Sequence, residues 1–337
     1  MFFNTSKLLF FLCLIIGTFL TISSNSLMGV WMGLEINLLS FIPLMIDTNN
    51  LMTTEATLKY FLNQVMASLI LLFMMIFYMN NSMILFINNN YNIFMVIMMS
   101  TMLMKSGAAP FHFWLPQVMN KINWSNNLIL MTIQKIGPMI ILSYLINTKF
   151  LIFIIIMNMI VSTISGFNQI SLRKIMAFSS INHMGWMMLA LMMNETLWLN
   201  YFIFYSLFSL TVVFIFKNYN LYFLNQMFSL KINYLMKFII FCSFLSLGGL
   251  PPFLGFFPKW LVIQFMVNFN LALLTLMVFC SLIILYFYLR ICYSAFMLFN
   301  YFNSWKYFNY KNNIFMMINL FTTLMGLFFI SCMFMFL

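Results

Sequence analysis

Several ionisable side chains of this sequence lie inside long apolar stretches, among them Glu35, Lys105, Lys135, His183 and Lys259. A charged group near the centre of a bilayer costs about 2.5–3.5 kcal/mol on insertion scales, so such residues normally face a partner or water and serve a function. A buried lysine holds or releases its proton according to whether a carboxylate lies beside it. These residue types in apolar surroundings therefore meet the physical requirement for a relay site and leave the transported ion open.

Three of these residues lie near the middle of their runs. Glu35 is next to the midpoint of its apolar run, where its carboxylate cannot reach the head groups and needs a counter-charge or a proton. Lys135 is equally central in its run, and Lys105 lies two residues from the middle of another. We expect these three to be functional. Lys59 and Arg290 lie nearer the ends of their runs, where long side chains extend to the head groups, so a structural role explains them equally well.

The sequence has two histidines, His112 and His183. The polar neighbours Ser179, Ser180 and Asn182 favour a proton-carrying role for His183, and a satisfied packing histidine is an equal alternative. The five cysteines show no C-x-x-C spacing and fit small apolar packing residues. Because His and Cys are absent at ligand spacing, we expect no metal site and no redox cofactor in this chain.

The composition excludes a water-soluble fold, with 64% hydrophobic and 6% charged residues and a mean hydropathy of +1.02. An apolar run of about 20 residues spans the bilayer core. Eleven such runs are present: 8–25, 26–46, 55–79, 91–116, 124–147, 149–168, 171–192, 196–217, 236–267, 271–298 and 313–336. The sequence predicts an all-α integral membrane protein with one transmembrane domain over residues 1–337.

The net charge of +11 is an orientation signal and does not indicate nucleic-acid binding. Eleven crossings place Lys149 on one side and nine basic residues on the side of the N-terminus: Lys7, Lys121, Arg173, Lys174, Lys217, Lys231, Lys237, Lys306 and Lys311. Abundant Phe (44) and Met (36) beside scarce Gly (11) fit an A/T-rich mitochondrial gene. We therefore predict the mitochondrial inner membrane, with the N-terminus in the matrix and the C-terminus on the intermembrane side.

Two segments repeat the pattern G-x-x-P-F-x-x-[WF]-x-P without gaps, Gly107–Pro116 in the fourth run and Gly249–Pro258 in the ninth. Five crossings separate the copies, so the chain passes through them in opposite directions, as in inverted-topology repeats of transporters. Each proline leaves a carbonyl without its helical partner, which a membrane tolerates only against protein or a wet cavity. Pro138 frees the Gln134 carbonyl in the same way, and Lys105, Lys135 and Lys259 each lie within five residues of such a proline break. The repeated motif predicts two Pro/Gly-broken helices in an ion-conducting transporter fold.

Five segments are distinctive when taken together: Trp31–Asn37, Lys105–Trp114, Gln134–Pro138, Ser179–Gly185 and Gly248–Phe256. They resemble the subunit 2 family of mitochondrial NADH:ubiquinone oxidoreductase, respiratory complex I, in its insect-type form. Members of this family are membrane-arm subunits similar to cation/proton antiporters. The resemblance implies that NADH, FMN, iron–sulfur clusters and ubiquinone bind to other subunits, and that this chain holds none of them.

The resemblance also implies a role for each buried ionisable residue. Glu35 would pair with Lys105, Lys135 would be the central relay lysine, and Lys259 would lie at the exit half-channel. His183 matches the polar axis between the two half-channels. The implied partners are the other membrane-arm subunits of complex I, among them neighbouring antiporter-like subunits, and membrane phospholipids such as cardiolipin.

The leading hypothesis is a proton-translocating core subunit of an NADH:ubiquinone oxidoreductase, coupled to quinone reduction elsewhere in the complex. The alternative is a stand-alone cation/proton antiporter that uses the same buried charges. A purely structural membrane scaffold is a third class, and it predicts that apolar residues could replace the buried charges without functional loss.

Overall fold

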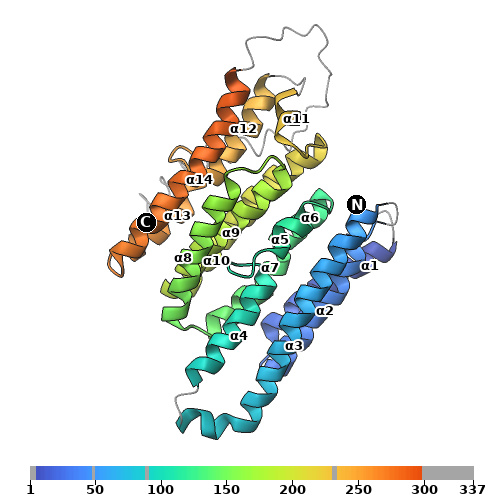
Figure 1. The fold of residues 1–337 in the computed structure, drawn as a ribbon, viewed down its shortest axis with the longest axis vertical. Coiled ribbons are helices and arrows are strands. Elements are labelled where there is room, and N and C mark those ends of the chain that lie inside the picture. Colours follow the sequence, from blue (N-terminus) through green and yellow to red (C-terminus); the bar gives the residue numbers. More distant parts are fainter. Residues whose placement is uncertain (1–4, 48–49, 88–90, 230–233, 298–337) are drawn as a thin grey trace, which may run out of the picture. The chain divides into compact units, whose positions relative to one another are not determined.

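The computed structural model describes residues 5–47, 50–87, 91–229 and 234–297 (Figure 1). These residues form helices and a single isolated bridge between Ser171 and Phe223, with no strand among them. The helices are α1 (Thr5–Ser23), α2 (Leu27–Met45), α3 (Leu51–Ile87), α4 (Tyr91–Ser106), α5 (Trp114–Met119), α6 (Trp124–Met131), α7 (Ile133–Tyr144), α8 (Thr148–Gly166), α9 (Leu172–Met193), α10 (Glu195–Asn218), α11 (Leu224–Ser229), α12 (Tyr234–Gly248), α13 (Phe256–Met266) and α14 (Leu271–Met297).

Within the described part of the chain, eight helices are long and apolar enough to cross a membrane, and two shorter apolar helices span Ile93–Ser106 and Phe238–Gly248. The predicted all-α membrane class is thus confirmed. Each of the first ten predicted runs coincides with one helix or with two consecutive helices. The eleventh run, 313–336, lies outside the described residues, so the count of eleven crossings stays a prediction.

Three of the predicted runs are split. The runs 91–116 and 236–267 become α4 with α5 and α12 with α13, as the repeated motif predicts. The run 124–147 is also interrupted, at Thr132 between α6 and α7. The sequence signal in that run was Pro138, which lies inside α7. Pro138 has no N–H to donate to the carbonyl of Gln134, four residues earlier. The helix is interrupted at Thr132, two residues before Gln134.

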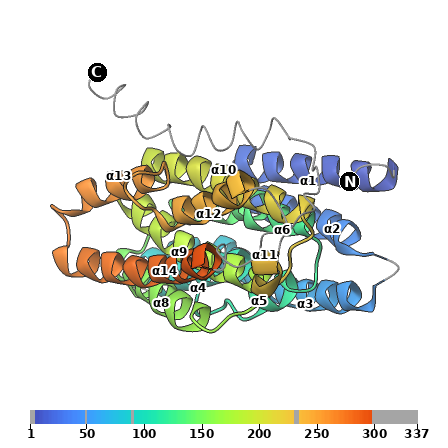
Figure 2. The ribbon, with the colours of Figure 1, turned by 90° about the horizontal axis from the view of Figure 1, so that it is seen from above.

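The chain divides into two compact units, residues 1–158 (unit 1) and 159–337 (unit 2). Each unit holds one copy of the broken-helix motif. In unit 1, α2 packs against α1 and α3, and α4 packs against α3 and α7. In unit 2, α9 contacts α10, α13 and α14, and Figure 2 shows it between α10 and α14. The predicted single domain over 1–337 stays a prediction.

Glycines let α1 and α2 approach closely in unit 1. A Cβ added at Gly33 of α2 would lie 2.6 Å from Cγ2 and 2.8 Å from the backbone nitrogen of Thr21 in α1. A Cβ at Gly137 of α7 would lie 3.3 Å from side chains of both Leu34 and Thr21. Small residues at such contacts are typical of membrane helix packing. The contact holds the helix that carries Glu35 against its neighbours.

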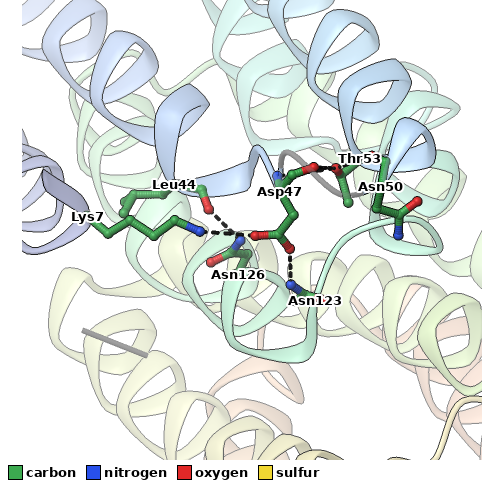
Figure 3. Close-up of polar contacts among 7 residues, drawn as sticks. All are labelled: Lys7, Leu44, Asp47, Asn50, Thr53, Asn123 and Asn126. Carbon is green, nitrogen blue, oxygen red and sulfur yellow. Dashed lines mark hydrogen bonds and ion pairs between the residues drawn. The ribbon is translucent and has the colours of Figure 1, made fainter. Parts of the chain in front are cut away.

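A polar cluster around Asp47 joins the helix ends at one end of unit 1 (Figure 3). Lys7 of α1 forms an ion pair with Asp47 at 3.0 Å, and Asn123, which precedes α6, donates to the same carboxylate. Asn126 of α6 donates to the Leu44 carbonyl of α2 at 2.7 Å. These contacts fix α6, and with it the start of α7, relative to α2. They thereby position the elements that carry Lys135 and Glu35.

We predict that Asp47→Ala destabilises the protein by about 1–2 kcal/mol, because it removes a charge-assisted acceptor from both Lys7 and Asn123. The measurement is the thermal unfolding midpoint of the protein purified in mild detergent. Glu55→Ala is the matched control, since Glu55 pairs with Lys59 and Lys121 while 49% of its side chain is exposed. Its loss should be about 1 kcal/mol or less. Equal losses in the two variants would contradict a positioning role for the Asp47 cluster.

Candidate functional site

The two copies of the motif adopt the same backbone geometry. Gly107 and Gly249 occupy aligned positions and have φ values of 73° and 80°. This left-handed conformation favours glycine, because a Cβ would be strained there. The preceding helices end at the aligned positions 106 and 248, and the following helices begin at the aligned positions 114 and 256. The interruption is therefore the same backbone device in each unit.

The end of α4 in unit 1 is capped by side chains from other elements. The indole of Trp114 donates to the Met104 carbonyl at 3.1 Å. Gln64 of α3 donates through Nε2 to the Lys105 carbonyl at 3.2 Å, and this bond is buried. A helix end leaves carbonyls without an N–H partner, and hydrocarbon supplies no substitute donor. These two side chains make the interruption tolerable beside Lys105.

A small cavity of about 10 Å³ lies against Lys105, close to the least space that admits one water molecule. Its polar lining comes from Asn37, Tyr60, Gln64, Lys105 and Gln134. The Tyr60 hydroxyl donates to Gln134 Oε1 at 3.5 Å. The buried atoms Asn37 Oδ1 and Gln134 Nε2 have no hydrogen-bond partner among the described residues. The cavity is thus polar and suited to hydration.

Glu35 lies near this cavity on α2. Its carboxylate interacts electrostatically with Lys105 and with Tyr60. Its buried Oε1 has no hydrogen-bond partner in the described part of the chain, and the ion pairs formed there do not join it to Lys105. The two charges are therefore near neighbours without a direct contact. The predicted Glu35–Lys105 pair stays a prediction.

Lys135 is the most buried of the predicted site lysines, with 1% of its surface exposed, against 6% for Lys105. It lies on α7 directly after Gln134, which lines the cavity beside Lys105. The three predicted residues Glu35, Lys105 and Lys135 thus lie on α2, α4 and α7, and residues of these three helices line one polar cavity.

Lys259 in unit 2 has a different kind of partner. It belongs to α13, and its Nζ donates to the carbonyl of Gly248, the last residue of α12, at 2.7 Å. Only 5% of its surface is exposed. The ammonium therefore reaches back across the interruption to the preceding half-helix.

His183 lies on α9, 5% exposed, and its Nδ1 is 2.9 Å from the Tyr201 hydroxyl of α10. The Tyr205 ring, one turn further along α10, lies 5.0 Å from the imidazole between centroids. The serines that the sequence placed beside the histidine, Ser179 and Ser180, are buried as well. Unit 2 therefore places the Tyr201 hydroxyl and the Tyr205 ring of α10 at His183, while the two serine hydroxyls bond to carbonyls of their own helix.

Sequence reasoning missed the uncharged partners, among them Tyr60, Gln64, Tyr201 and Tyr205. No buried charge marks these residues, and a lone polar residue in an apolar helix gives no periodic pattern. One signal was present: Tyr60 and Gln64 are four residues apart, as are Tyr201 and Tyr205, so each pair shares a helix face. The described residues contain no group of three or more His, Cys, Asp or Glu side chains that could hold a metal ion.

The less central ionisable residues have local partners. Lys59 forms an ion pair with Glu55 at 2.9 Å, and both side chains are more than two-fifths exposed. The Arg290 guanidinium lies 5.9 Å from the Phe167 ring centroid. His112 Nδ1 is 3.3 Å from the Pro110 carbonyl. These contacts fit structural roles for the three residues.

The chain is similar to known membrane proteins over most of its length. A profile of the family described as NADH:quinone oxidoreductase/Mrp antiporter, TM, matches residues 24–284. The NADH-ubiquinone oxidoreductase chain 2 of Anopheles gambiae is 52% identical over 311 residues, and that of Aedes aegypti is 59% identical over 312, with 91% of both chains covered in each case. A solved structure of respiratory complex I from Thermus thermophilus contains a chain of similar fold. It is 21% identical with a TM-score of 0.80, over 94% of this chain and 75% of that one.

We predict that Gln64→Leu lowers the stability by about 1–3 kcal/mol, because the Lys105 carbonyl would then be buried without its donor. The shift appears in thermal unfolding in mild detergent. Asn63→Leu is the control, since the neighbouring Asn63 donates to the Lys59 carbonyl within its own helix. A Gln64→Leu variant as stable as Asn63→Leu would show that the α4 end does not need this cap.

Proposed function

The chain belongs to the NADH:quinone oxidoreductase/Mrp antiporter family, in which it matches NADH-ubiquinone oxidoreductase chain 2 proteins, and we propose that it is a proton-translocating membrane-arm subunit of an NADH:ubiquinone oxidoreductase. One observation carries the proposal: a buried lysine lies near each interruption of the repeated motif, Lys105 in unit 1 and Lys259 in unit 2. Broken helices in transporters are where ion pathways run. A family member with this arrangement has the parts that a proton relay needs.

The relay begins at Glu35 and Lys105. Quinone reduction in another part of the complex changes the charge felt by Glu35, which alters how firmly Lys105 holds its proton. The polar cavity bounded by Lys105 and Gln134 gives water a place between these helices. Lys135 then takes up the charge change as the central relay lysine. No flavin, iron–sulfur or quinone chemistry is assigned to this chain, and NADH, FMN, iron–sulfur clusters and ubiquinone belong to other subunits.

The exit half lies in unit 2. His183, with the Tyr201 hydroxyl at its Nδ1, offers a group that accepts a proton on one nitrogen and releases it from the other. Lys259 is the last lysine of the relay. In this order the proton passes from the carboxylate partner of unit 1 to the carbonyl-held lysine of unit 2.

The location we propose is the mitochondrial inner membrane, with the N-terminus in the matrix. Support comes from the ion pairs of Lys7 with Asp47 and of Lys121 with Glu55. Asp47 and Glu55 flank the short α2–α3 connection, so Lys7 and Lys121 lie at the same end of unit 1, as the charge count requires. Other membrane-arm subunits and phospholipids such as cardiolipin are the partners that cover the exposed apolar side chains.

Purification separates this proposal from a stand-alone cation/proton antiporter. We expect the chain to be recovered from mild detergent inside a large assembly that oxidises NADH. Recovery alone or as a homodimer would instead support the antiporter.

Lys135→Met tests the relay. A positioned proton carrier contributes about 10²–10⁴ to the rate of a proton transfer, so we expect coupled proton uptake to fall at least about tenfold. The measurement is proton uptake by vesicles that contain the intact complex, beside NADH oxidation by an artificial electron acceptor, which should be unchanged. Lys149→Met, at an exposed position, is the control and should pump normally. Full pumping by Lys135→Met would refute the relay.

A further inference from the structure

Lys259 is held by the end of a helix. Its ammonium donates to the Gly248 carbonyl at 2.7 Å and is buried. Gly248 ends α12, so its carbonyl is one of the four that a helix leaves without an N–H partner. The carbonyl end of a helix also carries partial negative charge, which favours a cation. The contact therefore satisfies the helix end and the buried ammonium together.

A carboxylate partner for Lys259 is scarce in its own unit. Glu195 is the only acidic side chain between residues 159 and 337. It is exposed at the start of α10, and the ion pairs of the described residues include neither Glu195 nor Lys259. Lys105 in unit 1 has Glu35 nearby instead. The two relay lysines thus differ in what balances their charge.

Gly249 leaves the space that the ammonium occupies. A Cβ at this position would lie 3.0 Å from Lys259 Nζ, 3.1 Å from Cδ and 3.2 Å from Cε. Contacts this close are tighter than nine in ten real Cβ contacts, so a larger residue would displace the lysine side chain by a few tenths of an ångström or more. The residue also has a φ of 80°, which favours glycine for a separate reason.

The aligned glycine in unit 1 has different nearest neighbours. A Cβ at Gly107 would meet Leu115 Cδ1 at 2.7 Å, the end of a flexible apolar side chain, and its next nearest atoms belong to Leu115 and Trp114. Its φ of 73° carries the same backbone constraint. Gly107 is therefore a matched position with the same strain, where the added Cβ first meets apolar side chains.

We propose that the Gly248 carbonyl and the space over Gly249 form a seat for the Lys259 ammonium, which makes Gly249 a positioning residue for the last step of the relay. This inference rests on the proposed function. A neutral carbonyl holds the ammonium while the lysine is charged, and no buried carboxylate is left uncompensated when the proton leaves. Release from this seat is therefore easier than release from an ion pair.

The test compares four variants in vesicles that contain the intact complex: Gly249→Ala, Gly249→Asn, Gly107→Ala and Lys259→Met. Asn accepts a positive φ more readily than Ala, and both add the same Cβ. We expect both substitutions at Gly249 to lower proton uptake per NADH oxidised at least about fivefold, toward the level of Lys259→Met, since a charge-assisted hydrogen bond is lost. Gly107→Ala should reduce the amount of assembled complex and leave the ratio unchanged.

Two outcomes would overturn the seat. A normal ratio in Gly249→Asn would show that position 249 acts through backbone strain alone, and an equal loss in Gly107→Ala would show a general effect of distorting either break. If Lys259→Met lowers the ratio and the Gly249 variants do not, the seat is wrong and the proposed function stands.

A density map of the unaltered complex gives a readout that does not depend on pumping. Lys259 Nζ within about 3.2 Å of the Gly248 carbonyl oxygen supports the seat, even if Lys259→Met pumps normally and the relay itself fails. An ammonium that points away from that carbonyl overturns the seat.

Discussion

A backbone carbonyl inside hydrocarbon needs a donor from the protein, and this requirement governs the two interruptions that carry the repeated motif. In unit 1 the donors are Trp114 and Gln64, which close the end of α4. In unit 2 the donor is the ammonium of Lys259, which closes the end of α12. Each interruption thus brings polar side chains deep into an apolar region, and those side chains surround the ionisable residues. The site exists because the breaks must be capped.

The distribution of acidic residues makes the two units electrically different. Three of the four acidic side chains, Glu35, Asp47 and Glu55, belong to unit 1, and unit 2 has only Glu195. Asp47 and Glu55 tie helix ends together through lysines, while Glu35 lies deeper, beside the cavity region. Unit 2 has no comparable supply of carboxylates and relies on carbonyl and hydroxyl groups. A similar backbone therefore supports unlike surroundings for its lysines.

The sequence was most informative where a physical rule acts on every residue of a segment. Apolar runs gave the helices, and the repeated Gly/Pro pattern gave both breaks, because the positive φ at Gly107 and Gly249 and the missing proline N–H are local properties. In the run 124–147, Pro138 predicted a break, but the interruption lies six residues earlier at Thr132, where no residue forbids a helix. The partners of the buried charges were also missed: which glutamine or tyrosine reaches a given carbonyl depends on packing between helices far apart in the chain.

The caps of α4 and α12 are synthesised at different times relative to the helix ends that they close. Gln64 precedes the carbonyl that it caps by 41 residues, so its helix is already made when the end of α4 emerges. Lys259 follows its carbonyl by 11 residues. At about 5–20 residues per second, the end of α12 waits for its cap for roughly 0.5–2 s after leaving the ribosome. During that interval the half-helix, 15 residues long, is too short to span the bilayer alone, so the insertion machinery must shelter it until α13 arrives.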